Sequence, residues 1–316
     1  MQVWEDVSEV PSDWPASVVT IGAFDGVHKG HRQLIRTAVN RAKVAGLPSL
    51  VLTFSPNPAE VVGHGEPPVR ISTLQQRLRL ISELGPDATA VIKFSEEVAA
   101  LTPSQFAGSM LSDRLHAALV VIGENFRFGH KARGDVTLLR QLGGPLGFTV
   151  EAVHLLRSVS AGQPISSTLI RKYVAEGDVS AASRALVRPH RVEGVVVAGD
   201  GRGHELGFPT ANVQHTPRAA IPADGIYAGR MVIDPYGPDR ESLPAAISIG
   251  TNPTFDGVQR RVESFAYDAD NLSLYDKHIA VDFVARIRDQ ERFPDSAALV
   301  TAVERDIDHS RAILGG

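Results

Sequence analysis

The chain contains no cysteine and carries little net charge. Because there is no thiol, it can form no disulfide, no thiolate nucleophile and no cysteine-ligated zinc site. Its formal charge of −4 at pH 7 gives no reason to expect a nucleic-acid or anionic-membrane partner. Any bound phosphate therefore has to be held by local groups rather than by a broadly basic surface.

Long hydrophobic runs are also missing. Apolar stretches such as residues 119–122 are far too short to span a bilayer. The N-terminal segment lacks a basic start followed by an apolar run, so it does not resemble a signal peptide. We expect a cytoplasmic protein with no membrane partner, and its 316 residues predict two domains.

The first half alternates between strand and helix patterns. Helical spacing places Leu34, Ala38 and Ala42 on one apolar face, and Leu74, Leu78 and Ile81 on another. This alternation predicts a Rossmann-like, doubly wound α/β domain over residues 1–186, with its ligand at the carboxyl ends of the strands. The short apolar runs that are typical of buried parallel strands lie at residues 18–21, 50–54, 90–94, 118–122 and 149–155.

The pattern changes near residue 187. Strand-like runs then follow with few helices between them, and glycine and proline punctuate the gaps, which predicts an antiparallel sheet or small barrel. A final helix carries Leu299, Val303 and Ile307 at helical spacing. Residues 187–316 are thus predicted to form a second domain, with strands near 192–198, 226–233, 245–249, 262–267 and 279–284.

The strongest local signal is GAFDGVHKGH at residues 22–31, between a predicted strand and a predicted helix. Glycines let the backbone approach a phosphate closely, and a helix N-terminus supplies N–H groups and positive potential. The imidazoles of His28 and His31 can donate to charge that grows on phosphoryl oxygens. The alternative is a tight turn with two surface histidines, but the strand–turn–helix placement and the H-x-G-H spacing favour a nucleotide site.

Three further segments accompany this turn. ISSTLIR at residues 165–171 precedes a short helix, and its hydroxyls together with Arg171 can hold phosphate; an ordinary Ser/Thr N-cap is the alternative. TFSPNP at 53–58 and GENFRFG at 123–129 follow predicted strands, where a doubly wound domain binds its ligand. Phe126 and Phe128 are either ligand contacts or core residues.

GAFDGVHKGH, ISSTLIR and NFRFG together resemble the N-terminal half of prokaryotic bifunctional FAD synthetases, which are H-x-G-H nucleotidyltransferases. The resemblance implies transfer of AMP from ATP to FMN, with His28 and His31 as catalytic residues. It implies that ATP is bound by Gly22, Phe24, Asp25, Gly26, Gly30, Ser166, Ser167 and Arg171, and the flavin by Asn57, Asn125, Phe126 and Phe128. The chain departs from the family at Ser55 and Asn57, where a carboxylate and a histidine are usual; Asn57 can form hydrogen bonds but cannot titrate.

A second set of motif residues lies in the C-terminal half, at residues 199–212. Gly199, Gly201 and Gly203 can wrap a phosphate with backbone N–H groups, although a glycine-rich hairpin is the alternative. Thr210 and Asn212 alternate, so both side chains leave one face of an extended strand. A hydroxyl and an amide oxygen side by side suit Mg²⁺.

Glu263 lies in the strand-like segment RVESFAY. A single strand glutamate is most often just solvated, but next to a nucleotide it can act as a general base. GRGHELGFPTAN, PADGIYAG, SIGTNPTF and VESF together resemble riboflavin kinases. This resemblance implies a six-stranded antiparallel barrel with a terminal helix. It implies that Glu263 is the catalytic base for the riboflavin 5′-hydroxyl and that Thr210 and Asn212 are metal ligands. It implies a Mg–ATP site at Gly199, Gly201, Gly203, Gly207, Thr210 and Asn212.

The two resemblances cover nearly the whole chain, which looks most like actinobacterial members. They predict a bifunctional enzyme that uses riboflavin, FMN and ATP, with Mg²⁺ as cofactor and FAD as product. A transient homo-oligomer is left open. Asp276 replaces the glycine of the family's D-L-Y-G pattern, so the turn there is expected to be reshaped.

Three alternatives compete with this prediction. The first is an FMN adenylyltransferase whose kinase-like module only binds flavin or is structural. The second is a flavin-binding regulatory protein on a borrowed fold. The presence of His28, His31, Thr210, Asn212 and Glu263 argues against both. The third is an H-x-G-H enzyme for another substrate, such as pantetheine phosphate, which leaves the second half unexplained.

Overall fold

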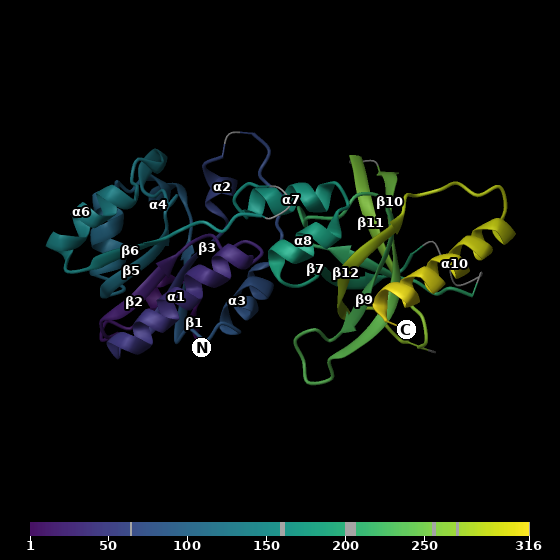
Figure 1. Ribbon diagram of the computed structural model, residues 1–316, viewed down its shortest axis with the longest axis horizontal. Helices are drawn as coiled ribbons and strands as arrows, with labels where there is room; N and C mark the ends of the chain where they lie inside the picture. Colours follow the sequence, from purple (N-terminus) through teal and green to yellow (C-terminus); the bar gives the residue numbers. More distant parts are fainter. Residues whose placement is uncertain (64, 159–161, 200–206, 255–256, 270–271, 316) are drawn as a thin grey trace. The chain divides into compact units, whose positions relative to one another are not determined.

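The computed structural model describes the chain except residues 64, 159–161, 200–206, 255–256, 270–271 and 316, and it describes no side chains within 252–259. The chain forms two compact units (Figure 1). The first comprises residues 1–68 and 73–166, and the second comprises 69–72 and 167–316. Residues 167–186 thus belong to the second unit, and the predicted boundary at 186/187 stays a prediction.

The first unit contains a parallel sheet, as the sequence predicts, and this sheet has six strands where the sequence shows five apolar runs. β1 is a short edge strand that pairs with β4 and carries no apolar run, so only the structure reveals it. In spatial order the strands are β1 (Gln2–Trp4), β4 (Ala88–Lys93), β3 (Ser49–Ser55), β2 (Ser17–Ile21), β5 (Ala117–Gly123) and β6 (Thr149–Val153).

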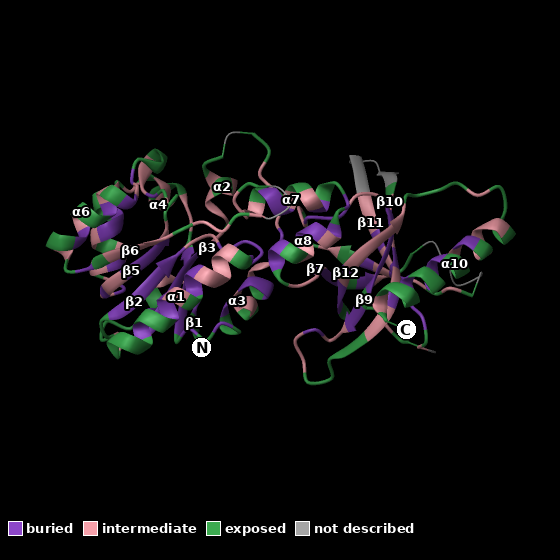
Figure 2. Ribbon diagram, viewed as in Figure 1, coloured by how far each residue is buried: buried purple, intermediate pink, exposed green. Residues whose placement is uncertain are grey.

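Helices cover both faces of this sheet. On one face α1 (Lys29–Ala45) and α3 (Leu74–Ser82) bury a cluster with Val18 and Val51. On the other, α6 (Val136–Leu146) and the π-helix η2 (Phe106–Ser112) cover Val19 and Leu50. Neighbouring strand residues therefore face opposite layers, and β2 is drawn in the buried colour (Figure 2). The shorter helices are η1 (Val7–Glu9), α2 (Pro58–Val61), α4 (Glu96–Ala100), α5 (Pro103–Gln105) and η3 (His130–Ala132).

The second unit is a closed antiparallel barrel of six strands, which confirms the predicted fold. Five strands coincide with the predicted apolar runs, and the sixth, β8, begins within the PTAN motif. In barrel order they are β10 (Glu241–Thr254), β11 (Gly257–Ala266), β8 (Ala211–His215), β7 (His190–Val197), β12 (His278–Arg288) and β9 (Gly225–Ile233).

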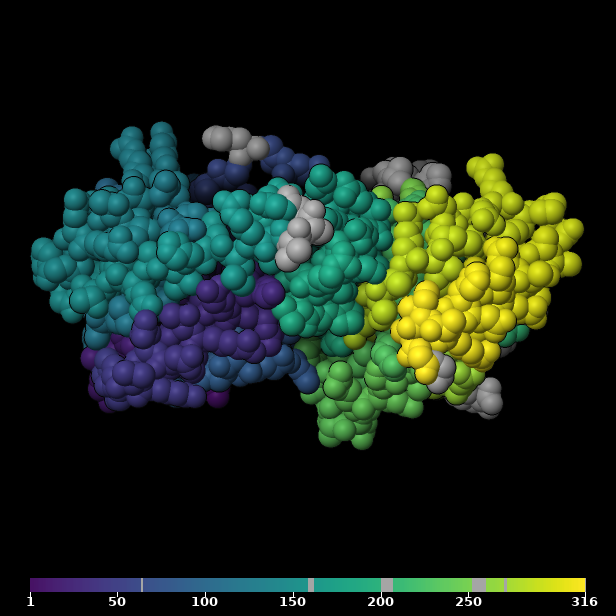
Figure 3. Space-filling model, viewed as in Figure 1, coloured from purple at the N-terminus to yellow at the C-terminus, as the bar shows by residue number. Residues whose placement is uncertain are grey.

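The described part of this unit also contains three helices. α7 (Ser167–Ala175) and α8 (Val179–Leu186) form a pair, and α8 contacts β7 and β12. The C-terminal helix α10 (Ser296–Leu314) crosses β9, β10 and β12 as an outer layer (Figure 3). A buried Asp306 on this helix pairs with Arg288 at 2.6 Å, which anchors the helix to β12. Within the described residues, no helix is both long enough and apolar enough to cross a membrane.

A four-residue segment of the first half also belongs to the barrel unit. The backbone N–H of Arg70 donates to Arg218 at 2.7 Å, and the N–H of Ala220 donates back to Arg70 at 2.8 Å. The Arg171 guanidinium donates to the Val69 carbonyl at 2.6 Å. Residues 69–72 are therefore held by both backbone and side-chain hydrogen bonds within the second unit.

Candidate active sites

The first site lies at the carboxyl edge of the parallel sheet. β2 pairs with β3 on one side and with β5 on the other, so the strand order reverses at this point. Ligands of open α/β sheets bind at such switch points, outside the carboxyl ends of the strands. The loops that follow these three strands are the H-x-G-H turn, the SPNP segment and the ENFRFG segment, so the topology brings the three predicted segments to one edge.

The H-x-G-H turn holds strained backbone. Phe24 and Val27 are fully buried and have positive φ angles of 48° and 40°, and Gly26 has a φ of 80°. A left-handed conformation at a non-glycine residue costs about 1–3 kcal/mol and persists only when its surroundings enforce it. Such strain is typical of functional turns, which agrees with a binding role for this one.

His28 is the N-cap of α1. Its Nδ1 accepts a hydrogen bond from the backbone N–H of His31 at 3.3 Å, so in this tautomer the proton is on Nε2. A Cβ at Gly30 would lie 3.3 Å from the His28 ring and 3.9 Å from the carbonyl oxygen of Ile165. Gly30 is thus a close-approach position, and ISSTLIR begins beside the turn.

The two imidazoles are stacked, with centroids 3.5 Å apart. Nδ1 of His31 is buried and has no hydrogen-bond partner among the described residues. Burial, together with the electrostatic effects of His28 and Arg77, holds the pKa of His31 well below its usual value of 6.5. His31 is therefore neutral near pH 7, and its ring can present one N–H donor and one acceptor to a ligand.

Arg77 of α3 is a site residue that the sequence reasoning missed. It is 6% exposed, and its guanidinium donates to the carbonyl of Ala23 at 2.5 Å and to that of Phe54 at 2.8 Å. The available signal was its position, three residues after Leu74 and four before Ile81, on the predicted apolar face of the helix. An arginine on a buried face needs polar partners.

The predicted flavin residues have mixed surroundings. Asn57 caps α2, and its Oδ1 accepts from the N–H of Ala59 at 3.1 Å. Asn125 is exposed beside Gly123. Phe128 is 6% exposed within the core, and Phe126 stacks on it at 5.6 Å while staying partly exposed. Phe126 and Asn125 are thus the better placed of these four candidates.

The ISSTLIR motif spans the boundary between the two units. Ser166 is the last residue of the first unit, whereas Ser167 begins α7 in the second. Arg171 lies in that helix and donates to the Val69 carbonyl. The roles of Ser166, Ser167 and Arg171 at the triphosphate stay predictions.

The second site lies on the face of three barrel strands. β8 and β11 pair so that Glu263 lies directly opposite Asn212, and on its other side Asn212 pairs with Val197 of β7. Val262 and Ser264 are buried inside the barrel, so Glu263 faces outward, as predicted from the alternation. Directly opposite residues have Cβ atoms about 4.5–5.5 Å apart, so the amide and the carboxylate lie close together.

A pocket of about 220 Å³ adjoins this pair, lined by residues 197–199, 212–215 and 260–262. A Cβ at Gly199 would come within 2.2 Å of the Asn212 amide, so this position has no room for a side chain. Thr210 precedes β8 and is half-buried, and Gly207 has a φ of 86°. Gly201 and Gly203 lie outside the described residues.

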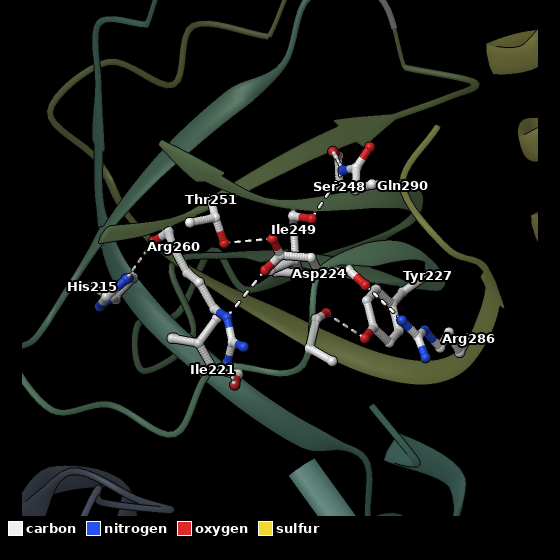
Figure 4. Close-up of polar contacts among 11 residues, drawn as sticks. His215, Ile221, Asp224, Tyr227, Ser248, Ile249, Thr251, Arg260, Arg286 and Gln290 are labelled. Atoms are coloured by element: carbon white, nitrogen blue, oxygen red, sulfur yellow. Dashed lines mark hydrogen bonds and ion pairs between the residues drawn. The ribbon is translucent and has the colours of Figure 1, made fainter. Parts of the chain in front are cut away.

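The PADGIYAG and SIGTNPTF segments meet at Asp224 (Figure 4). Its carboxylate accepts hydrogen bonds from Thr251 and from Nε of Arg260, the latter at 3.1 Å. Its backbone carbonyl accepts from Arg286 at 2.6 Å, and Arg286 lies over the ring of Tyr227. The PADG segment is thereby fixed to three strands of the barrel: β10, β11 and β12.

Asp276, which replaces the glycine of the family's D-L-Y-G pattern, adopts a backbone conformation that glycine favours. Asp276 has a φ of 63°, the left-handed conformation that glycine favours, and its N–H donates to Val196 at 3.0 Å. Aspartate tolerates this region better than most residues. The substitution thus keeps a glycine-like backbone at this position.

Comparisons with known proteins match both halves of the chain. The FAD synthetase family model matches residues 10–169, and the riboflavin kinase family model matches residues 186–314. The chain belongs to the bifunctional riboflavin kinase/FMN adenylyltransferase family. The predicted family, fold class and enzyme class are confirmed.

The members of this family that resemble the chain cover almost all of it. The bifunctional riboflavin kinase/FMN adenylyltransferase of Escherichia coli (strain K12) is 33% identical over 98% of this chain and 96% of its own length. That of Pseudomonas fluorescens is 33% identical over 99% and 98%, respectively. A crystal structure described as a macrolide-efflux protein from Streptococcus pneumoniae has a TM-score of 0.86 and 29% identity, and covers 98% of both chains.

Proposed function

We propose that the chain converts riboflavin to FMN in the barrel unit and FMN to FAD in the sheet unit, with ATP as the second substrate of both reactions. The observation that carries this proposal is that the central residues predicted for each reaction lie together within one unit. The H-x-G-H pair lies at the switch point of the sheet, and Asn212 lies opposite Glu263 on the barrel.

In adenylyl transfer, a phosphate oxygen of FMN attacks the α-phosphorus of ATP. The bond to the β-phosphate oxygen breaks, and pyrophosphate leaves. Negative charge grows on the phosphoryl oxygens, and the N–H groups of His28 and His31 can donate to it. The N-terminal N–H groups of α1 add positive potential at the same place. His31 donates as a neutral imidazole, because its pKa is lowered.

In the kinase reaction, the riboflavin 5′-hydroxyl attacks the γ-phosphorus of ATP and ADP leaves. We assign the hydroxyl proton to the Glu263 carboxylate, which faces out of the barrel beside the Asn212 amide. The adjoining pocket supplies space for part of a nucleotide, with Gly199 at its wall. The backbone N–H of Gly199, at the described start of the glycine-rich segment, can contribute to holding its phosphates.

The residues beside Glu263 fit Mg²⁺. Thr210 offers a hydroxyl just before β8 and Asn212 offers an amide oxygen on β8, and both are hard ligands of the kind this ion prefers. Over the residues the structure describes, no three histidine, aspartate or glutamate side chains form a metal-binding group. Mg²⁺ commonly keeps several waters and binds substrate phosphates, so two protein ligands suffice, and when bound it neutralises phosphate charge.

One incubation tests the proposal. The chain is supplied with riboflavin, ATP and Mg²⁺, and riboflavin, FMN and FAD are separated by chromatography over time. We expect FMN to appear first and FAD to follow. FAD from added FMN, with no FMN from riboflavin, would instead mean an adenylyltransferase with a silent kinase-like module. Neither product would mean a flavin-binding protein without catalysis. We expect the enzyme to be cytoplasmic.

A further inference from the structure

Arg77 joins two loops that come from neighbouring strands. Ala23 follows β2 and begins the H-x-G-H turn, whereas Phe54 lies at the end of β3, directly before the SPNP segment. One guanidinium donates to both carbonyls, at 2.5 Å and 2.8 Å. The Thr53 hydroxyl also donates to the Ala23 carbonyl, at 3.3 Å. The start of the H-x-G-H turn and the start of the SPNP segment are therefore hydrogen-bonded to the same side chain.

These contacts require a guanidinium in particular. Its planar fork places donors on separate nitrogens in a fixed geometry, so it can hold two carbonyls at once. A lysine ammonium is a compact point charge on a flexible stem and holds such a pair less well. Packing alone does not require a polar group here, because Ile81 on the same helix face is completely buried.

The turn beyond Ala23 depends on its surroundings. Phe24 and Val27 keep left-handed backbone only while neighbouring groups enforce it, and Ala23 is the residue directly before them. His28, which caps α1 at the end of the turn, is held through the same stretch of backbone. The charge of Arg77 also acts on His31, since it helps to lower the pKa of that imidazole.

We propose that Arg77 is a positioning residue for adenylyl transfer, which fixes the H-x-G-H turn and the SPNP segment in one arrangement so that the ATP phosphates meet the flavin phosphate. This inference rests on the adenylyltransferase function proposed above. It adds a residue on α3 that is 6% exposed and acts through two backbone carbonyls.

The test compares three variants of the full chain. Arg77→Met removes the donors and keeps the length, Arg77→Lys keeps the charge and loses the fork, and Arg79→Met is the control at an exposed position of the same helix. Because a misplacement of about 1 Å can cost about 10²-fold in rate, we expect the Arg77→Met kcat for FAD formation to fall about 100-fold. We expect the KM values for FMN and ATP to change by less than about threefold, and Arg77→Lys to be intermediate.

Two internal readouts separate positioning from folding. FMN formation by the same variants should stay at the wild-type rate, because that reaction belongs to the other unit. Amide hydrogen exchange at residues 22–28 should become faster in Arg77→Met while the barrel is unchanged. If Arg77→Met does not fold, Arg77→Lys decides: full kcat in that variant overturns the proposal.

The proposal is also overturned if folded Arg77→Met keeps a kcat within about threefold of wild type, because a positioning loss should be far larger. A wild-type chain that makes no FAD from FMN and ATP would instead contradict the proposed function. In that case hydrogen exchange still decides whether Arg77 holds the turn: unchanged exchange at residues 22–28 overturns the positioning role.

Discussion

The two units build their sites in different ways. In the sheet unit the candidate groups lie beyond the strand ends, in loops and in the first turn of α1, and a strained turn with a buried arginine sets their positions. In the barrel unit Asn212 and Glu263 lie on the strands themselves, where the pairing of β8 with β11 puts them opposite each other. The site of the sheet unit, here called the loop site, depends on contacts that hold a turn. The site of the barrel unit, here called the strand site, depends on the register of strand pairing. A register shift of one residue would turn every side chain of the strand to the other face.

The largest effect is expected in the strand site, from Glu263→Gln. The change keeps the shape and hydrogen bonding but removes the basic carboxylate, and general-base catalysis typically contributes about 10²–10⁴-fold. Single-turnover FMN formation with saturating riboflavin and Mg–ATP measures the loss. Thr210→Ala is the matched comparison, because it should weaken Mg–ATP binding and leave proton removal intact.

Two observations would count against this base role. A Glu263→Gln rate within about threefold of wild type excludes it, since the smallest general-base effect expected is larger. FAD formation from supplied FMN should be unchanged in both variants, and a parallel loss there would indicate a general folding defect.

In the loop site we expect His28→Ala and His31→Ala each to lower FAD formation by about 10²–10³-fold, the usual worth of one donor to a developing oxyanion. FMN formation should be spared. Lys43→Ala, an exposed change in the last turn of α1, is the control and should behave as wild type. Wild-type FAD synthesis by either histidine variant at saturating FMN and ATP would remove that residue from the mechanism.

The direction of the side chains in the strand site could be predicted from sequence, for a physical reason. The outward direction of Glu263 and Asn212 follows from the two-residue period of a strand, which any short segment reveals. Their pairing across β8 and β11 does not, because it joins residues far apart in the chain. β8 itself was absent from the predicted apolar runs, since its alternation interrupts the apolar pattern with Asn212 and Gln214.

The loop site shows what sequence patterns leave out. The glycines and histidines of the turn indicate a phosphate site. The left-handed backbone at Phe24 and Val27 could not be predicted from sequence, because glycine is the residue that normally signals this conformation. Arg77 lies in a separate helix, and only the fold brings it to Ala23 and Phe54.

Two C-terminal fragments test how self-contained the barrel is. A cut near Arg188 should leave residues 187–316 as a soluble riboflavin kinase, because this half has its own complete motif set. We expect residues 167–316 to be more stable, since α8 buries Val179 and Leu186 completely. Burying two such side chains contributes about 3–6 kcal/mol.

Thermal unfolding and riboflavin turnover of both fragments, beside the full chain, give the answer. We expect the longer fragment to have the higher Tm, by at least about 5 °C. Equal Tm values would show that α7 and α8 do not stabilise the barrel. An inactive shorter fragment beside an active longer one would show that the helices are needed for the kinase fold itself.

The smallest effect concerns pH and belongs to the loop site alone. Because burial and nearby positive charge lower the pKa of His31 in the folded unit, the unfolded chain binds this proton more readily. The stability associated with neutral His31 is therefore complete above the unfolded value of 6.5 and is lost as the pH falls below it. One proton changes the free energy of unfolding by at most about 1.4 kcal/mol per pH unit.

Denaturant unfolding of His31→Asn should show a shallower loss of stability of the first unit below pH 6.5 than wild type does. His309→Asn, at an exposed position of α10, should leave that slope unchanged. Identical slopes for His31→Asn and wild type would mean that His31 accepts its proton as easily in the folded turn as in the unfolded chain, which its stacked and buried position argues against.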